Sequence, residues 1–363
     1  MSSKQATAQT NLDAISRNFD QVRQLAPSSK IMAVIKADAY GHGAAQVAKK
    51  LKQADAFAVA RVSEAVKLRE AGVGGTICLL EGVMNREDLN LASIYELQVV
   101  VHSEDQLELM TRSGARRDVW LKIDTGMGRL GIRPEKADSA LQKLDQQRLI
   151  GLMTHFAQSD EVGAELTVRQ IEKIRSISRQ LYRHNPAAAV ISMANSAGIM
   201  AHADSRSDWI RPGLMLYGAS PLADLEPDPD LHPAMHFSAP VISIRDIKVG
   251  DSVGYGSIWT TERDTRIAVV GAGYADGYPR EMAQGTPVLV NGERRRLVGR
   301  VSMDMITVEL EKSDVVEMGD HVTLWGEGLP VEEIARCAGT IPYTLTCGIA
   351  GRVRRTFRGE VRG

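Results

Sequence analysis

Cysteine, net charge and long apolar runs are all scarce in this chain. Its 363 residues carry a formal net charge of −1, so we expect neither a nucleic acid nor an anionic membrane as a partner. No apolar run approaches the roughly 20 residues that a bilayer span needs. The only cysteines are Cys78, Cys337 and Cys347, whose odd number and spacing suit neither a disulfide framework nor a metal site. We therefore expect free, buried thiols and no bound metal.

The remaining composition is ordinary for a globular protein, with 44% hydrophobic and 25% charged residues. The first residues contain no apolar segment of the kind found in signal peptides, so we expect a cytoplasmic protein. A chain of this length predicts two domains, or one large barrel with an addition.

Short apolar runs alternate with amphipathic stretches over the first two-thirds of the chain, and they predict eight strands. The runs are Ile31–Ile35, Ala56–Ala60, Ile77–Leu80, Leu97–Val101, Val119–Ile123, Leu149–Met153, Val190–Met193 and Trp209–Ile210. Helical patterns between them cover residues 11–25, 64–71, 103–113 and 165–184. This alternation predicts an α/β fold with a (β/α)8 barrel. A doubly wound sheet is the alternative, weakened because no GxGxxG follows the first strand.

Polar residues of different chemistry follow five of the predicted strands. They are Lys36, Arg129, His155, Ser196 and Arg211. Polar residues follow strands in many proteins, which explains any one of them. In a barrel, however, the carboxyl ends of the strands meet at one mouth, so we expect these side chains to lie close together.

The pattern changes near a Pro- and Asp-rich connector at residues 225–233. Short β-like runs and tight turns follow, and Asn291-Gly292 between apolar runs is a strong hairpin signal. We interpret residues 8–232 as the barrel domain and residues 233–363 as a mainly β domain. Residues 6–10 are predicted to form a strand that joins the second domain.

Lys36 ends the apolar run 31–35 and is followed by a small, Gly-rich turn that contains Tyr40. Desolvation in a half-buried pocket favours the neutral, nucleophilic amine, which a Schiff-base lysine requires. A single lysine at a strand end is more often one that only extends its amine to solvent. The turn sequence that follows favours the first interpretation.

Several further strings occur together with this turn. They are VIKADAYGHG (34–43), KIDTGMGRLG (122–131), THF (154–156), ANSAG (194–198), RPGLMLYG (211–218), VGYG (253–256), GYADGYPR (273–280), GRVSMDM (299–305) and PY (342–343). From about residue 8 to its C-terminus, the chain resembles the bacterial alanine racemases. The resemblance implies a (β/α)8 barrel followed by a β domain, and a homodimer whose active sites use residues from both subunits.

The resemblance also implies pyridoxal phosphate as cofactor and alanine as substrate. Racemisation removes the α-proton from one face and returns a proton to the other, so two groups on opposite faces are required. By resemblance, Lys36 carries the cofactor and is the base for D-alanine, and Tyr255 of the partner subunit is the base for L-alanine. The alternative interpretation of Tyr255 is a tyrosine packed within the β domain, and the flanking Gly254 and Gly256 favour the catalytic role. The product would serve peptidoglycan synthesis or alanine catabolism.

Further residues are assigned by the same resemblance. Those that contact or orient the cofactor are Tyr40, His155, Ser196, Arg211, Gly213, Leu214 and Tyr343. Those that approach the substrate carboxylate are Arg129, Met303 and Asp304. The residues that match the family's access corridor, which admits small amino acids, are Asp160, Tyr274, Arg280 and Tyr343. Lys122 is carbamylated in several family members, and the sequence leaves both the modified and the plain amine open. Ser196 also suits a plain helix N-cap.

Other classes of protein share parts of these sequence patterns. A broader-specificity amino-acid racemase has the same scaffold but usually carries a signal peptide and a disulfide. Decarboxylases of basic amino acids share the barrel-plus-β plan with other cofactor motifs. A single-barrel pyridoxal-phosphate carrier lacks a second domain, whereas about 130 residues follow the connector here, a length that suits a domain.

Overall fold

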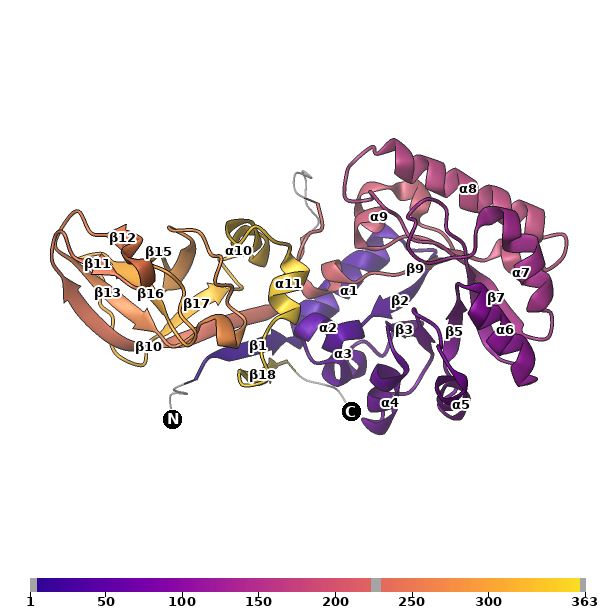
Figure 1. Cartoon of the computed structure of the whole chain (residues 1–363), viewed down its shortest axis with the longest axis horizontal. Coiled ribbons are helices and arrows are strands. Elements are labelled where there is room, and N and C mark those ends of the chain that lie inside the picture. Colours follow the sequence, from indigo (N-terminus) through magenta and orange to yellow (C-terminus); the bar gives the residue numbers. More distant parts are fainter. Residues whose placement is uncertain (1–4, 223–229, 360–363) are drawn as a thin grey trace.

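The computed structural model describes residues 5–222 and 230–359 of the chain. It contains a closed parallel barrel and, beside it, a mainly β body that holds the described residues from Met235 onward (Figure 1). Within the described ranges, no helix is long and apolar enough to cross a membrane.

Eight parallel strands close the barrel, and β9 pairs with β2 to complete it. They are β2 (Lys30–Val34), β3 (Ala56–Val59), β4 (Ile77–Leu79), β5 (Gln98–Val101), β6 (Asp118–Lys122), β7 (Arg148–Met153), β8 (Ile191–Ser192) and β9 (Trp209–Ile210). Each predicted run matches one of these strands to within one or two residues at either end. The runs are predominantly apolar because barrel strands are buried on both faces.

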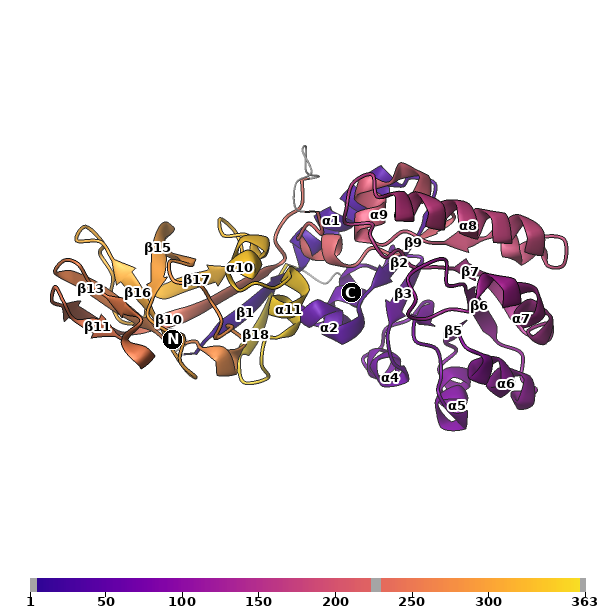
Figure 2. The ribbon, with the colours of Figure 1, turned by 45° about the horizontal axis from the view of Figure 1, so that its top comes forward.

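Helices surround the barrel (Figure 2). They are α1 (Leu12–Leu25), α2 (Lys36–Gly41), α3 (Ala44–Lys50), α4 (Val62–Glu70), α5 (Arg86–Ile94), α6 (Glu104–Ser113), α7 (Ala137–Lys143), α8 (Glu165–Leu181) and α9 (Ser196–Ala201), with short 3-10 turns η1 (Pro134–Lys136), η2 (Pro186–Ala189), η3 (Ala203–Ser205) and η4 (Leu214–Tyr217). The four predicted helices correspond to α1, α4, α6 and α8. At the start of α1, the Asn11 side chain accepts hydrogen bonds from two backbone N–H groups, which explains why the helix begins there.

The β body is built on one sheet in the order β13-β16-β15-β14-β17-β10-β1-β18, with β13 also paired to β10. Its strands are β1 (Thr7–Asn11), β10 (Met235–Ile247), β13 (Thr265–Val270), β14 (Pro287–Val290), β15 (Glu293–Val298), β16 (Ile306–Leu310), β17 (His321–Trp325) and β18 (Arg354–Arg358), beside the small pair β11 (Ser252–Val253) and β12 (Trp259–Thr260). Helices α10 (Val331–Cys337) and α11 (Pro342–Cys347) and the turns η5 (Tyr255–Ser257) and η6 (Tyr274–Asp276) complete it. The hairpin predicted at Asn291-Gly292 joins β14 to β15, and both residues have positive φ.

The chain crosses between the two bodies more than once. Strand β1 pairs with β10 and β18 of the β body and then continues into α1 of the barrel. The side-chain amide of Asn18, on α1, donates to the carbonyls of Leu216 and His232, and its oxygen accepts from the N–H of His232. These bonds hold Leu216, before the predicted connector, and His232, near its end; residues 225–229 of the connector lie outside the described residues.

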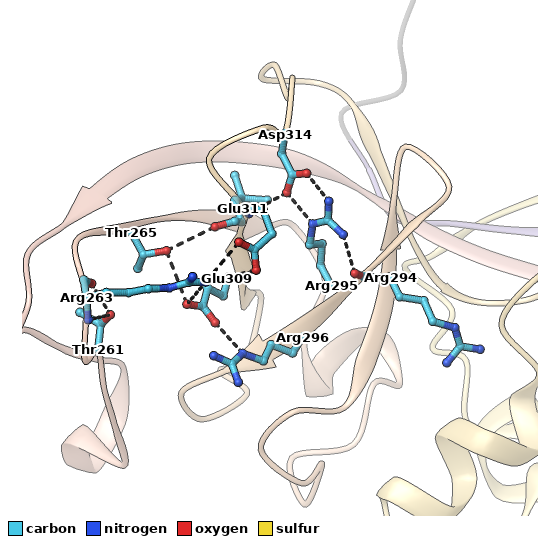
Figure 3. A network of polar contacts seen from close by, with 10 residues as sticks. Thr261, Arg263, Thr265, Arg294, Arg295, Arg296, Glu309, Glu311 and Asp314 are labelled. Atoms are coloured by element: carbon cyan, nitrogen blue, oxygen red, sulfur yellow. Dashed lines mark hydrogen bonds and ion pairs between the residues drawn. The ribbon is translucent and has the colours of Figure 1, made fainter.

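A network of arginines and carboxylates joins β13, β15 and β16 at the far end of the β body (Figure 3). The Glu309 carboxylate, 4% exposed, accepts a hydrogen bond of 2.5 Å from Arg296 and lies 3.5 Å from the guanidinium of Arg263. Arg295 pairs with Asp314 in the same network. A buried carboxylate requires such partners, and the network links side chains of these neighbouring strands.

Candidate functional site

A cavity of about 610 Å³ opens at the carboxyl ends of the barrel strands. Predicted site residues that line it are Lys36, Tyr40, Lys122, Arg129, His155, Ser196, Arg211, Gly213, Leu214 and Tyr343. Its size suits a small ligand. The mouth of the barrel therefore gathers residues that are up to about 300 positions apart in the sequence.

The turn that begins at Lys36 has an unusual backbone. Residues 37–40 have φ between 51° and 54°, which is one turn of left-handed helix made of non-glycine residues. Such a conformation costs roughly 1–2 kcal/mol per residue. It persists only where the surrounding structure enforces it. Because such strained segments cluster at active sites, the conformation indicates that residues 37–40 belong to a functional segment.

Contacts from both bodies enforce this turn. The N–H of Ala37 donates to Glu64 of α4 over 2.7 Å. On the other side, Arg355 of β18 donates to the carbonyl of Gly41. Gly41 itself has φ +83°, and a Cβ there would lie 2.1 Å from the carbonyl oxygen of Thr346 on α11. Figure 1 shows α11 directly beside α2, so the β body clamps the segment that presents Lys36.

Ser196, Gly213 and Tyr40 form a small polar cradle at one side of the cavity. The hydroxyl oxygen of Ser196 accepts hydrogen bonds from the N–H groups of Gly213, at 2.9 Å, and Met215, at 3.3 Å. A Cβ on Gly213 would lie 2.6 Å from the Tyr40 hydroxyl, so only glycine permits this approach. Burial raises the pKa of the Tyr40 hydroxyl, which therefore remains a neutral donor. Hydroxyls and backbone amides of this kind suit a phosphate group.

The structure gives Ser196 a different role from the plain N-cap that we also considered. The residue that caps α9 is Asn195, whose side-chain oxygen accepts from the N–H of Gly198. Ser196 is the first helical residue, and its hydroxyl turns toward the segment after β9 instead. This leaves Ser196 in the cradle.

Arg211 is buried at the end of β9, and its hydrogen-bond partners among the described residues are uncharged acceptors. It donates to the Ser192 hydroxyl and the Thr154 carbonyl, each at 2.7 Å, and lies 3.3 Å from Nδ1 of His155. Burial lowers the pKa of Arg211 to about 10, so it remains charged at neutral pH. Burial, and then Arg211 with other nearby cations, holds the pKa of His155 well below its usual range. His155 is therefore neutral, with Nδ1 positioned to accept from Arg211.

Positive charge dominates the rest of the cavity wall. Burial, followed by the charges of Arg211, Arg129 and Lys36 in that order, lowers the pKa of Lys122 from 10.5 to about 8. Arg129 sits on a loop held by Asp124, whose carboxylate accepts from three successive N–H groups of residues 126–128. A cavity with this charge is suited to anionic ligands.

The remaining predicted residues lie outside this cavity. Tyr255, Met303 and Tyr274 are on the surface of the β body, with 68%, 52% and 41% of their area exposed. Asp304 and Arg280 are also exposed there. Asp160 is exposed near the cavity mouth, where its charge, after burial, contributes to raising the pKa of Tyr343 to about 12.

Sequence reasoning missed two features of the site. Glu81 lines the cavity and lies two residues after β4, so the rule that selected Lys36 and Arg211 would have found it. The left-handed turn has no local signal, because Ala-Asp-Ala-Tyr is compatible with an ordinary helix. Among the described residues, no group of three or more His, Cys, Asp or Glu is arranged to hold a metal ion.

The fold and the site together define a class of protein. It is a two-domain enzyme in which a barrel presents a strand-end lysine in a cationic cavity with a polar cradle, and a β domain supports the lysine turn. Residues 10–221 match the model of the alanine racemase N-terminal domain, and residues 234–357 match that of the C-terminal domain.

Individual relatives agree over nearly the whole chain. An alanine racemase from Photobacterium profundum is 44% identical over 98% of this chain and 99% of its own length. One from Vibrio cholerae is 42% identical with the same two coverages. The crystal structure of the biosynthetic alanine racemase from Pseudomonas aeruginosa is similar with a TM-score of 0.92, at 41% identity, covering 98% of this chain and all of that one. The chain belongs to the alanine racemase family. Membership implies a pyridoxal-phosphate-dependent enzyme.

Proposed function

We propose that this protein is an alanine racemase, which interconverts L-alanine and D-alanine with pyridoxal phosphate bound in the barrel mouth. The observation that carries the proposal is the convergence of Lys36, on its left-handed turn, with a phosphate-sized cradle and a cationic wall in one cavity.

The residues of the cavity fit the proposed cofactor. The hydroxyls of Ser196, Tyr40 and Tyr343 are suited to hold its phosphate, and Gly213 and Leu214 line the cavity beside them. Lys36 is the amine that would attach it. When bound, the cofactor withdraws electrons from the α-carbon of an attached amino acid and so acidifies its proton. Arg211 supplies a charged donor whose hydrogen-bond partners among the described residues include no carboxylate, which matches the arginine that faces the ring nitrogen in the resembled family.

Two groups on opposite faces would move the α-proton. On one face, the proposed group is Lys36. For the other, we propose Tyr255 of the partner subunit in a homodimer. In one direction the first group accepts the α-proton and the second donates its own, and the reverse reaction restores both. The exposure of Tyr255, Met303 and Tyr274 on the β body, and of Ile341, which is 57% exposed at the cavity rim, supports an interface between subunits.

The charged residues of the cavity wall are suited to orient the substrate. Arg129 is suited to pair with the substrate carboxylate, with Met303 and Asp304 of the partner subunit approaching the same group. Asp160, Tyr274, Arg280 and Tyr343 would line the access corridor. We further propose that Lys122 is carbamylated: its neutral amine attacks carbon dioxide, a C–N bond forms and one proton leaves to solvent. The resulting anion would neutralise part of the charge around Arg129 and Arg211.

Incubation of the purified protein with L-alanine, followed by chiral chromatography, tests the proposal. We expect equal amounts of the two enantiomers at equilibrium, because their free energies are identical, and no conversion by Lys36→Ala. Borohydride reduction and peptide mapping should place a pyridoxyl group on Lys36, and Lys49→Ala, at a lysine outside the cavity, should not change the label. A label on Lys122, or D-alanine formation by Lys36→Ala at the wild-type rate, would contradict the proposal.

A further inference from the structure

His42 lies two residues after the left-handed turn and is 1% exposed. Its Nδ1 lies 3.0 Å from the carbonyl oxygen of Ala39 and 3.0 Å from that of Tyr40. A carbonyl oxygen can only accept a hydrogen bond, so Nδ1 must carry a proton and donate to both.

The other ring nitrogen has a different environment. Nε2 of His42 is buried and has no hydrogen-bond partner among the described residues. Burial lowers the pKa of His42 to about 4, and the nearby charge of Arg355 acts in the same direction. A second N–H would have no acceptor at this position, so the geometry assigns the neutral ring with its proton on Nδ1.

This ring braces Tyr40 in two ways. It holds two backbone carbonyls of the turn, and it stacks on Tyr217 with 4.5 Å between ring centroids. Tyr217 in turn packs against the Tyr40 ring at 5.0 Å and donates to the carbonyl of Val34, at the end of β2, over 2.8 Å. Backbone and side chain of Tyr40 are therefore both fixed relative to the strand that leads to Lys36.

We propose that His42 is a positioning residue of this enzyme. By donating from Nδ1 to the carbonyls of Ala39 and Tyr40, it keeps the turn in the left-handed conformation that presents Lys36 and the Tyr40 hydroxyl to the cavity. It lines no part of the cavity that holds Lys36. The proposal rests on the proposed function, since it concerns the binding of pyridoxal phosphate and the turnover of alanine.

Two substitutions separate the ring nitrogens. His42→Asn puts an amide N–H near the position of Nδ1, whereas His42→Gln puts its amide near Nε2 and removes the donor to the turn. We expect His42→Gln to weaken pyridoxal-phosphate affinity, measured by titration of the apoprotein, by about tenfold, the factor expected for loss of a net hydrogen bond. Its kcat should fall by a similar factor, while KM for alanine stays within about threefold. His42→Asn should stay within about threefold of wild type in cofactor affinity, kcat and KM.

Trp325→Phe is the matched control, because Trp325 lines the same small cavity as His42 and its Nε1 also has no partner among the described residues. It should leave cofactor affinity and kcat unchanged.

Equal effects of His42→Asn and His42→Gln, or none from either, would overturn the proposal. The tautomer is measured on the wild-type protein, so it decides even where a variant does not fold. With 15N-labelled histidine, NMR should show a proton on Nδ1 of His42 and none on Nε2 at pH 7.5, assigned through contacts with the Tyr217 ring. A proton on Nε2 would refute the assignment. If wild type fails to racemise alanine, the proposed function fails, whereas the tautomer and the cofactor affinity still decide the role of His42.

Discussion

Carbon dioxide should stabilise this protein through Lys122. The residue is 9% exposed, and burial with three neighbouring cations lowers the pKa of its amine from 10.5 to about 8. One pKa unit corresponds to about 1.36 kcal/mol, so the plain ammonium costs the folded state about 3 kcal/mol at pH 7. Carbamylation replaces this cation with an anion among Arg211, Arg129 and Lys36 and removes that cost. For a chain of this length, such a gain corresponds to a rise in Tm of about 4 °C.

The pH dependence of stability gives a second signature. Because the folded-state pKa lies below the unfolded value of 10.5, the unmodified amine makes the protein lose stability as pH falls from 10.5 to about 8. In buffer free of carbon dioxide, wild type should therefore gain stability as pH rises through this window. Bicarbonate should flatten the profile, since the carbamate no longer takes up this proton.

The assay compares thermal unfolding of wild type and Lys122→Met in bicarbonate and in chloride of equal pH and ionic strength. We expect bicarbonate to raise Tm only for wild type, and native intact mass to show the addition of one carbon dioxide. Lys122→Met should not respond to bicarbonate, and in chloride it should be more stable than wild type. An unmodified native mass, together with a wild-type Tm that ignores bicarbonate, would refute the reasoning.

Two further predictions concern the supports of the site and of the β body, each measured by urea unfolding against a matched control. Gly41→Ala should lower the free energy of unfolding by about 4 kcal/mol or more, since its Cβ would lie 2.1 Å from the Thr346 oxygen. The control Gly72→Ala, with similar positive φ and nothing within 4 Å, should lower it by only about 1–2 kcal/mol. Equal losses would show that contact with α11 does not matter. Glu309→Gln should lower the free energy of unfolding by about 1–2 kcal/mol, because a buried carboxylate loses its charge beside Arg296. The same change at exposed Glu311 should cost much less. Equal losses would show that Glu309 is not central to the network of Figure 3.

The barrel could be predicted from the sequence because its strands are buried on both faces, and such strands appear as short apolar runs. Even β8 and β9, each with two residues, were found in this way. The rule that strand ends converge then brought Lys36, Arg129, His155, Ser196 and Arg211 to one mouth, and they all line one cavity. These outcomes follow from topology rather than from detailed packing.

The left-handed turn could not be predicted, because tertiary contacts enforce it. Glu64, 27 residues after Ala37, and Arg355, 314 residues after Gly41, hold its two ends. Ser196 shows a second limit. Asn195 and Ser196 are adjacent and both suit an N-cap, and only the position of Gly213, set by β9, decides which of them turns into the cradle.

Tyr255 shows a third limit. The sequence assigns it to the β body, and the structure of one chain leaves it 68% exposed and outside the cavity. Its role depends on a second subunit, so neither local pattern nor the fold of one chain establishes it.

The central claim is that Lys36 of one subunit and Tyr255 of the other form one two-base site. Lys36→Ala and Tyr255→Phe subunits, each inactive alone, should be mixed, exchanged and assayed for D-alanine formation. Random exchange of equal amounts places both intact residues in one of the two sites of each mixed dimer, so we predict recovery of about a quarter of wild-type activity. No recovery after exchange verified by mass spectrometry would contradict the shared site.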